Sequence, residues 1–150
     1  MNKGKAYVFI DTNFWLIPYK YKIDIFSELE RILLRKYEII ISNSVVRELE
    51  NIQKNLKKKG EDRIAAKIGI ELIKRKKVKK VGIDIFQKIF EKNDGRDVDS
   101  LILKISEILT KKGYDFIVCT NDKKLRKKLI EKNEKIKIIG MKEKNKLDFI

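Results

Sequence analysis

Short runs of apolar residues alternate along this chain with longer stretches in which apolar residues recur every three or four positions. Short runs bounded by polar turns are typical of strands buried on both faces, and the longer spacing is typical of amphipathic helices. Strands are expected at residues 6–10, 38–41, 78–83, 114–119 and 136–139. Alternation of this kind predicts an α/β fold with a parallel sheet covered by helices on both faces.

Five helical segments lie between or beside these strands, and a shorter one is expected at residues 85–90. Asp24, Ser42 or Asn43, and Asp97 precede helical patterns at positions where a side-chain oxygen can cap the first turn. Inner faces are assigned to the following residues: Ile25, Phe26, Leu29, Ile32 and Leu33; Val45, Val46, Leu49, Ile52 and Leu56; Ile64, Ile68 and Leu72 in the helix 61–75; Val98, Leu101, Ile102, Ile105, Ile108 and Leu109.

The remaining features concern domain organisation. An Asn93-Asp94-Gly95 turn precedes the helix with Val98, Gly113 is expected to end it, and residues 122–131 form a short basic helix. The length predicts one domain over residues 1–150, with 141–150 as a polar, loose tail.

The charge balance points to an anionic partner. The chain has 37 Lys and Arg residues against 22 Asp and Glu residues, a formal net charge of +15. A thermophile's charged surface explains many of these residues but not the imbalance, so we expect nucleic acid as the partner. The sequence shows no membrane span or signal peptide, and we therefore expect a cytoplasmic protein without a membrane partner.

The absence of two residue types restricts the chemistry. The chain has no histidine and one cysteine, Cys119, which lies in an apolar run and is expected to be a buried, inert thiol. Histidine-dependent triads, disulfides within the chain and zinc sites built from Cys or His are therefore excluded. Any catalysis must use carboxylates, lysines, hydroxyls or a hard metal ion.

Acidic residues recur where the expected strands end or on the helices that follow them. They are Asp11, Glu48, Asp97 with Asp99, and Asp122. Taken alone, Asp97 and Asp122 could serve a helix start and Glu48 could be solvated, whereas Asp11, directly after a buried strand, is the hardest to explain in this way. The carboxyl ends of parallel strands share one edge of a sheet, where ligands bind. Clustered carboxylates need a cation, and a site with only oxygen ligands favours Mg²⁺ or Mn²⁺. A water on such an ion can attack a phosphodiester.

Four short motifs carry these acidic residues and resemble those of a known family. Residues 9–18 (Phe-Ile-Asp-Thr-Asn-Phe-Trp-Leu-Ile-Pro), 46–49, 97–102 and 120–125 resemble, in order, the four acidic motifs of the PIN-domain ribonucleases. The similarity spans roughly residues 6 to 140, and is greatest to the archaeal branch that resembles VapC-type nucleases and the nuclease of small-subunit pre-rRNA processing.

The resemblance implies a three-layer α/β/α fold with a five-stranded parallel sheet, and Mg²⁺- or Mn²⁺-dependent endonucleolytic cleavage of RNA. It implies Asp11, Glu48, Asp99 and Asp122 as the catalytic and metal-binding acids. Asp97, Asn13, Thr120 and Asn121 are expected to be auxiliary; Asp99 is preferred to Asp97 because it keeps the family's spacing to Ile102.

Contacts to RNA are expected from basic and aromatic side chains. Lys57, Lys58, Lys59, Lys123, Lys124 and Lys127 are candidate phosphate contacts, with further basic residues at 75–80 and at Arg126 and Lys128. Phe14, Trp15, Tyr19 and Tyr21 are candidates for base stacking, with core packing as the alternative. The RNA would be a ribosomal precursor, or tRNA or mRNA for a toxin, and an antitoxin, a ribosome-assembly protein or a second copy of the chain are candidate partners.

Two other functions are compatible with parts of the sequence. A non-catalytic RNA-binding scaffold would keep the fold and the basic surface, but intact acids in all four motifs speak against it. A phosphohydrolase with Asp11 as nucleophile resembles the haloacid-dehalogenase-like enzymes, which need a second Asp two residues later, where this chain has Asn13.

Overall fold

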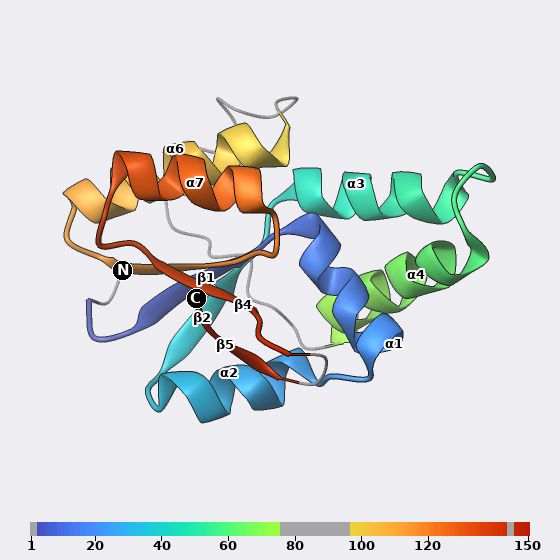
Figure 1. The fold of residues 1–150 in the computed structure, drawn as a ribbon, viewed down its shortest axis with the longest axis horizontal. Helices are drawn as coiled ribbons and strands as arrows, with labels where there is room; N and C mark the ends of the chain where they lie inside the picture. The colour runs from blue at the N-terminus through green and yellow to red at the C-terminus, as the bar shows by residue number, and fades with distance from the viewer. Residues whose placement is uncertain (1–2, 76–96, 144–145) are drawn as a thin grey trace.

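The computed structural model describes residues 3–75, 97–143 and 146–150, and the statements below concern these residues (Figure 1). The strand expected at 78–83, the helical turns at 85–90, the turn at 93–95 and the lysines at 76–80 lie outside the described residues.

The sheet contains β1 (Ala6–Ile10), β2 (Tyr37–Ile40), β3 (Asp115–Cys119), β4 (Lys137–Met141) and β5 (Leu147–Phe149), in the order β2-β1-β3-β4-β5. β2, β1, β3 and β4 are parallel, as the alternation of elements predicts. β1 is buried at every position, and it lies between β2 and β3. The ends of β1 and β3 are therefore neighbours, and this juxtaposition places the acidic residues.

The fully parallel sheet and the loose tail predicted at 141–150 are both wrong. β5 pairs antiparallel with β4, so the described sheet is mixed. Helix α2 (Ile25–Leu33) fixes this strand: the Arg31 guanidinium donates to the Leu147 carbonyl at 2.7 Å, and the Leu147 N–H donates to Glu28 Oε1 at 3.1 Å. Leu147 is fully buried, so apolar packing adds to these bonds.

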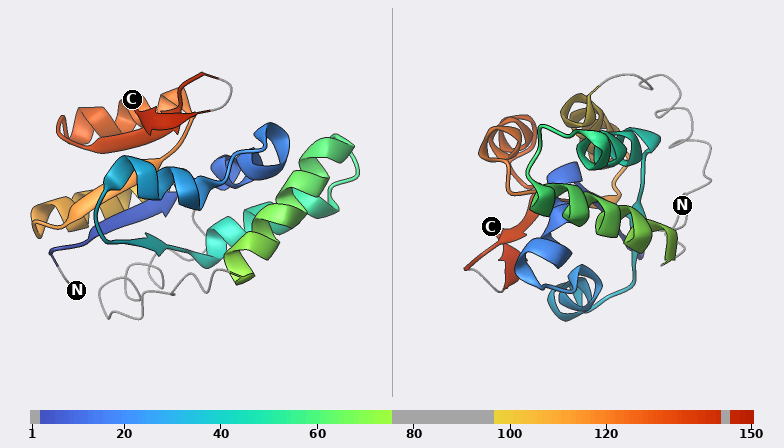
Figure 2. Two further views of the ribbon diagram at one scale, coloured as in Figure 1. Left: turned by 90° about the horizontal axis from the view of Figure 1, so that it is seen from below. Right: turned by 90° about the vertical axis from the view of Figure 1, so that its right-hand side faces the viewer.

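Helices cover both faces of the sheet. The 3₁₀ helix η1 (Thr12–Leu16) and α1 (Ile17–Tyr21) follow β1; the others are α3 (Asn43–Lys54), α4 (Gly60–Arg75), α6 (Val98–Lys111) and α7 (Lys123–Lys132). α6 and α7 lie on one face and α2 on the other, while α3 and α4 pack against each other beyond the end of the sheet (Figures 1 and 2). No helix among the described residues is long and apolar enough to cross a membrane.

Local signals set most helix starts. Asp24, Ser42 and Asp97 cap α2, α3 and α6 through their side chains, and Gly113 follows α6 with a φ of +79°, as predicted. The helix 122–131 is present one residue later, because Asp122 is its N-cap.

Two inner-face assignments are wrong. Leu56 is 81% exposed because α3 ends at Lys54, and Ile64 on α4 is 46% exposed. α4 instead buries small residues, among them Ala65, Ala66 and Gly69. Close packing on η1 explains this: a Cβ at Gly69 would lie 2.9 Å from the Trp15 carbonyl oxygen.

Candidate active site

Asp11 lies at the carboxyl end of β1, held at the junction with β3. Its backbone N–H donates to the Cys119 carbonyl at 3.0 Å, which extends the β1–β3 ladder by one bond. Its carboxylate accepts two hydrogen bonds, from the Thr12 N–H to Oδ1 at 2.8 Å and from the Thr120 hydroxyl to Oδ2 at 2.9 Å. The side chain is thus fixed from both neighbouring segments.

The environment of Asp11 disfavours its charge. The residue is 7% exposed. Burial raises the pKa of its carboxyl from 3.8 to about 6; the bonds from Thr120 and Thr12 oppose the rise, and the charges of Asp99 and Asp122 add to it. A buried carboxylate that neighbouring acids destabilise is typical of a functional site.

The Thr12 hydroxyl links Glu48 to the site. It lies on α3, and its Oε2 accepts a hydrogen bond from Thr12 Oγ1 at 2.6 Å. Thr12 therefore contacts both acids, Asp11 with its N–H and Glu48 with its hydroxyl. Thr12 is not among the site residues expected from the sequence, although it directly follows Asp11.

Asp97 and Asp99 occupy different environments at the start of α6. Asp97 is the exposed N-cap, and the Ser100 N–H donates to its Oδ1 at 2.7 Å, which lowers its pKa. Burial, and then the charges of Asp122, Asp97 and Glu48, raise the pKa of Asp99. Asp99 is therefore the one of the two whose charge burial and the other acids disfavour.

Asp122 and its two predecessors form the loop from β3 to α7. Asp122 caps α7, accepting from the N–H groups of Lys124 and Leu125 at 2.9 and 3.2 Å. Its own N–H donates to Thr120 Oγ1 at 3.0 Å, so Thr120 links Asp122 to Asp11. Asn121 does not bond to the acids; its Oδ1 accepts from the Met141 N–H on β4 at 2.7 Å, tying the loop to the sheet.

The donor chemistry of this cluster suits a hard cation, because it offers only carboxylate and hydroxyl oxygens and because neighbouring acids add to the raised pKa of Asp11 and of Asp99. As the side chains stand, however, the described residues hold no group of three or more His, Cys, Asp or Glu arranged around one ion position. A cation shared by Asp11, Asp99 and Asp122 would require these carboxylates to draw closer together.

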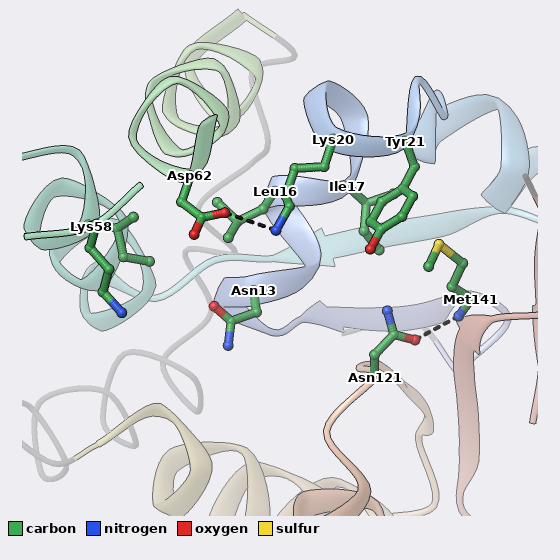
Figure 3. A pocket seen from close by; sticks show the side chains of 10 residues that line it. Asn13, Leu16, Ile17, Lys20, Tyr21, Lys58, Asp62, Asn121 and Met141 are labelled. Atoms are coloured by element: carbon green, nitrogen blue, oxygen red, sulfur yellow. Dashed lines mark hydrogen bonds and ion pairs between the residues drawn. The ribbon is translucent and has the colours of Figure 1, made fainter. Parts of the chain in front are cut away.

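A pocket of about 260 Å³ is lined by residues of η1, α1 and the β3–α7 loop, among others (Figure 3). Asn13 from η1 and Asn121 from the β3–α7 loop line it, so it adjoins the motifs that carry Asp11 and Asp122. Tyr21 at the end of α1 lines the same pocket. The structure thus places Asn13 at the rim of this pocket.

The predicted RNA contacts are distributed over two regions. Lys57, Lys58 and Lys59 are exposed in the connection between α3 and α4, and Lys123, Lys124 and Lys127 are exposed on α7. The charge of Lys128 on α7 adds to the lowering of the Asp97 pKa and opposes the rise of the Asp99 pKa, so it acts on the start of α6.

The aromatic candidates separate by burial. Phe14 and Trp15 are 2% and 0% exposed, so they belong to the core and the stacking role is wrong for both. The Tyr19 ring lies under the Lys22 ammonium, 4.3 Å from its centroid. Tyr21 is 41% exposed and remains accessible to a base.

Comparison with known proteins gives concordant results. A family model described as a PIN like domain matches residues 8–144. The chain is 32% identical over 132 residues to Ribonuclease VapC4 of Methanocaldococcus jannaschii, with 88% of each chain covered. It also superposes on the structure of the PIN domain endonuclease Utp24 with a TM-score of 0.67 and 26% identity, over 95% of this chain and 90% of that one.

Proposed function

The chain belongs to the family of PIN-like domains, and on this premise we propose that it is a metal-dependent endoribonuclease that hydrolyses phosphodiester bonds. Asp11, Glu48, Asp99 and Asp122 would be its catalytic acids. The observation that carries the proposal is Asp11 itself: a buried carboxylate at the sheet edge whose pKa two further acids, Asp99 and Asp122, help to raise. The names of the two relatives, a ribonuclease and an endonuclease, support the same reaction class.

The four acids would hold Mg²⁺ or Mn²⁺, which supplies an activated water and offsets negative charge on the phosphate. Thr120 and Thr12 act on the acids, since their hydroxyls donate to Asp11 and Glu48 and restrict how those carboxylates point. The lysines on α7 and in the α3–α4 connection would hold phosphates on either side of the cut, a contribution that is sensitive to salt and independent of sequence.

Cleavage of an end-labelled structured RNA in Mg²⁺, in Mn²⁺ and in EDTA tests the proposal. We expect fragments only with a divalent ion, and loss of about a hundredfold or more in rate for Asp11→Asn. RNA binding in EDTA should survive this substitution, because the phosphate contacts lie elsewhere. Equal cleavage by wild type and variant, or cleavage unaffected by EDTA, would refute the assignment.

Asp97 and Asp99 provide a matched pair within one helical turn. Asp99→Asn should reduce the cleavage rate as strongly as Asp11→Asn, since Asp99 is coupled to Asp122 and Glu48. Asp97→Asn should leave most activity, because Asp97 caps α6 from an exposed position. If Asp97→Asn reduced the cleavage rate more than Asp99→Asn, Asp97 would be the catalytic acid and Asp99 the auxiliary one.

The RNA would be a ribosomal precursor, a tRNA or an mRNA. An adjacent antitoxin, a ribosome-assembly protein and a second copy of the chain are the corresponding candidate partners. Co-purification of the chain from its native cells, followed by sequencing of the bound and cleaved RNA, would separate a toxin from a processing enzyme.

A further inference from the structure

We propose that the pocket lined by Asn13, Asn121 and Tyr21 holds one unpaired nucleobase of the RNA, with Tyr21 as its stacking surface. The inference rests on the proposed function and names the part of the substrate that this site recognises. The pocket volume of about 260 Å³ lies below the range of roughly 300–1,000 Å³ typical of sites for whole drug-sized ligands. A single base, anchored through its own chain, is an occupant of suitable size.

The charges in the pocket argue for a base rather than a phosphate. Lys20 points into the pocket but is paired with Asp62, with 2.9 Å between Nζ and Oδ1 (Figure 3). That pair leaves Lys58 as the single excess charge among the lining residues. A phosphate site would present several unpaired cations or backbone N–H groups. One lysine is sufficient for a backbone phosphate at the rim.

The remaining walls suit a flat, neutral ring with polar edges. Leu16 and Ile17 are apolar, and the partly exposed Tyr21 supplies an aromatic face. Asn121 uses its Oδ1 for the Met141 N–H, so its amide nitrogen is left to donate and points into the pocket (Figure 3). The figure shows no hydrogen bond from the Asn13 amide to the other residues drawn. Unpaired RNA bases are commonly bound by this combination of aromatic stacking and amide hydrogen bonds.

The position of the pocket relates the base to the cut. Asn13 lies two residues after Asp11, and Asn121 lies between Thr120, which binds Asp11, and Asp122. Because both amides belong to the segments that carry Asp11 and Asp122, a nucleotide with its base between them would direct a phosphate toward these acids. The pocket would thus select an unpaired nucleotide adjacent to the scissile bond.

Binding of two charge-matched oligonucleotides tests the proposal: a single-stranded RNA hexamer of mixed sequence, and the same ribose-phosphate chain without bases. Affinities are measured by fluorescence anisotropy in EDTA, so cleavage does not interfere. We expect wild type to bind the base-bearing hexamer about fivefold or more tightly than the abasic one, as stacking of one base predicts. Tyr21→Ala should abolish this preference, and Tyr21→Phe, which keeps the ring, should retain it.

Lys58→Ala is the matched control, because loss of a phosphate contact should weaken both hexamers by the same factor. Asn13→Ala is a second variant, outside α1, and should reduce the base preference in the same direction. A wild type without base preference, or a preference unchanged in Tyr21→Ala, would overturn the inference. RNA cleavage by wild type in the same preparation would then leave the proposed function standing, whereas base preference without any cleavage would refute only the nuclease.

Discussion

Replacement of Asp11 by Asn should stabilise the protein at neutral pH, although it removes a group that we place at the centre of catalysis. The folded protein raises the pKa of Asp11 from 3.8 to about 6, so the folded state binds this proton more tightly than the unfolded chain does. Stability must therefore fall as pH rises between these values, and the loss is complete above about pH 6. At about 1.36 kcal/mol for each unit of pKa difference, the total loss of folding stability is about 3 kcal/mol.

The substitution also changes the hydrogen bonds to this side chain. One of the two oxygens that accept from Thr12 and Thr120 becomes an amide nitrogen, which removes a bond of about 1 kcal/mol. We therefore expect Asp11→Asn to be about 2 kcal/mol more stable than wild type at pH 8, and the advantage to shrink toward pH 4. Urea denaturation in EDTA, followed by far-UV circular dichroism at both pH values, measures this difference.

Asp97→Asn is a control that should change the stability of the protein in the opposite direction. Its capping bonds lower the pKa of Asp97, so this carboxylate contributes stability that is present at neutral pH and is lost on acidification. Its removal should destabilise the protein at pH 8 and have less effect in acid. An advantage of Asp11→Asn that is equal at pH 4 and pH 8, or larger at pH 4, would refute the reasoning about burial and charge.

Three further substitutions or measurements test the fold. Gly69→Ala should cost about 1–3 kcal/mol, because its Cβ would lie 2.9 Å from a backbone oxygen of η1, while Gly60→Ala, with nothing within 4 Å, should be close to neutral; thermal denaturation compares them. Glu28→Ala removes the acceptor of the Leu147 N–H, so hydrogen exchange measured by NMR should accelerate at this amide while β1 stays protected. Cys119 is fully buried and its thiol pKa is raised, so it should react with a thiol reagent only in denaturant, and rapid reaction in the native state would contradict the packing of β3.

Elements with local signals were predictable from the sequence. β1 follows from five consecutive apolar residues, and α2 follows from a capping Asp24 with Ile25 and Leu29 at helical spacing. These patterns depend on a few neighbouring residues, and the structure confirms both. The family membership was equally accessible, because it depends on the order of four short motifs.

Elements that depend on distant partners were not predictable. β5 has only three residues in a mostly polar segment, and its Leu147 is held by an N–H bond to Glu28 and a carbonyl bond from Arg31, more than a hundred positions away. Ile64 on α4 was wrongly assigned to the buried face because α4 packs against η1 through small residues such as Gly69, which has no side chain. Apolar periodicity alone detects neither effect.

The site was only partly predictable. Topology predicts that acids at the ends of neighbouring strands approach one another, and the Thr120 hydroxyl links two of them, since it donates to Asp11 and accepts from the Asp122 N–H. Sequence alone does not show that Thr12 bonds to Glu48, or that Asn121 turns away to β4. The catalytic roles of the acids and of their neighbours stay predictions.

The Thr120 hydroxyl has one proton, and its two hydrogen bonds therefore have a fixed direction. Asp122 donates its N–H to this oxygen, and the oxygen donates onward to Asp11. Negative charge on Asp11 strengthens both bonds in series, because each polarises the next. Neutralising Asp11, by a proton or by substitution, would thus weaken the bond that holds Asp122, so the charge of a buried acid at the end of one strand is coupled to the N-cap of a lysine-rich surface helix.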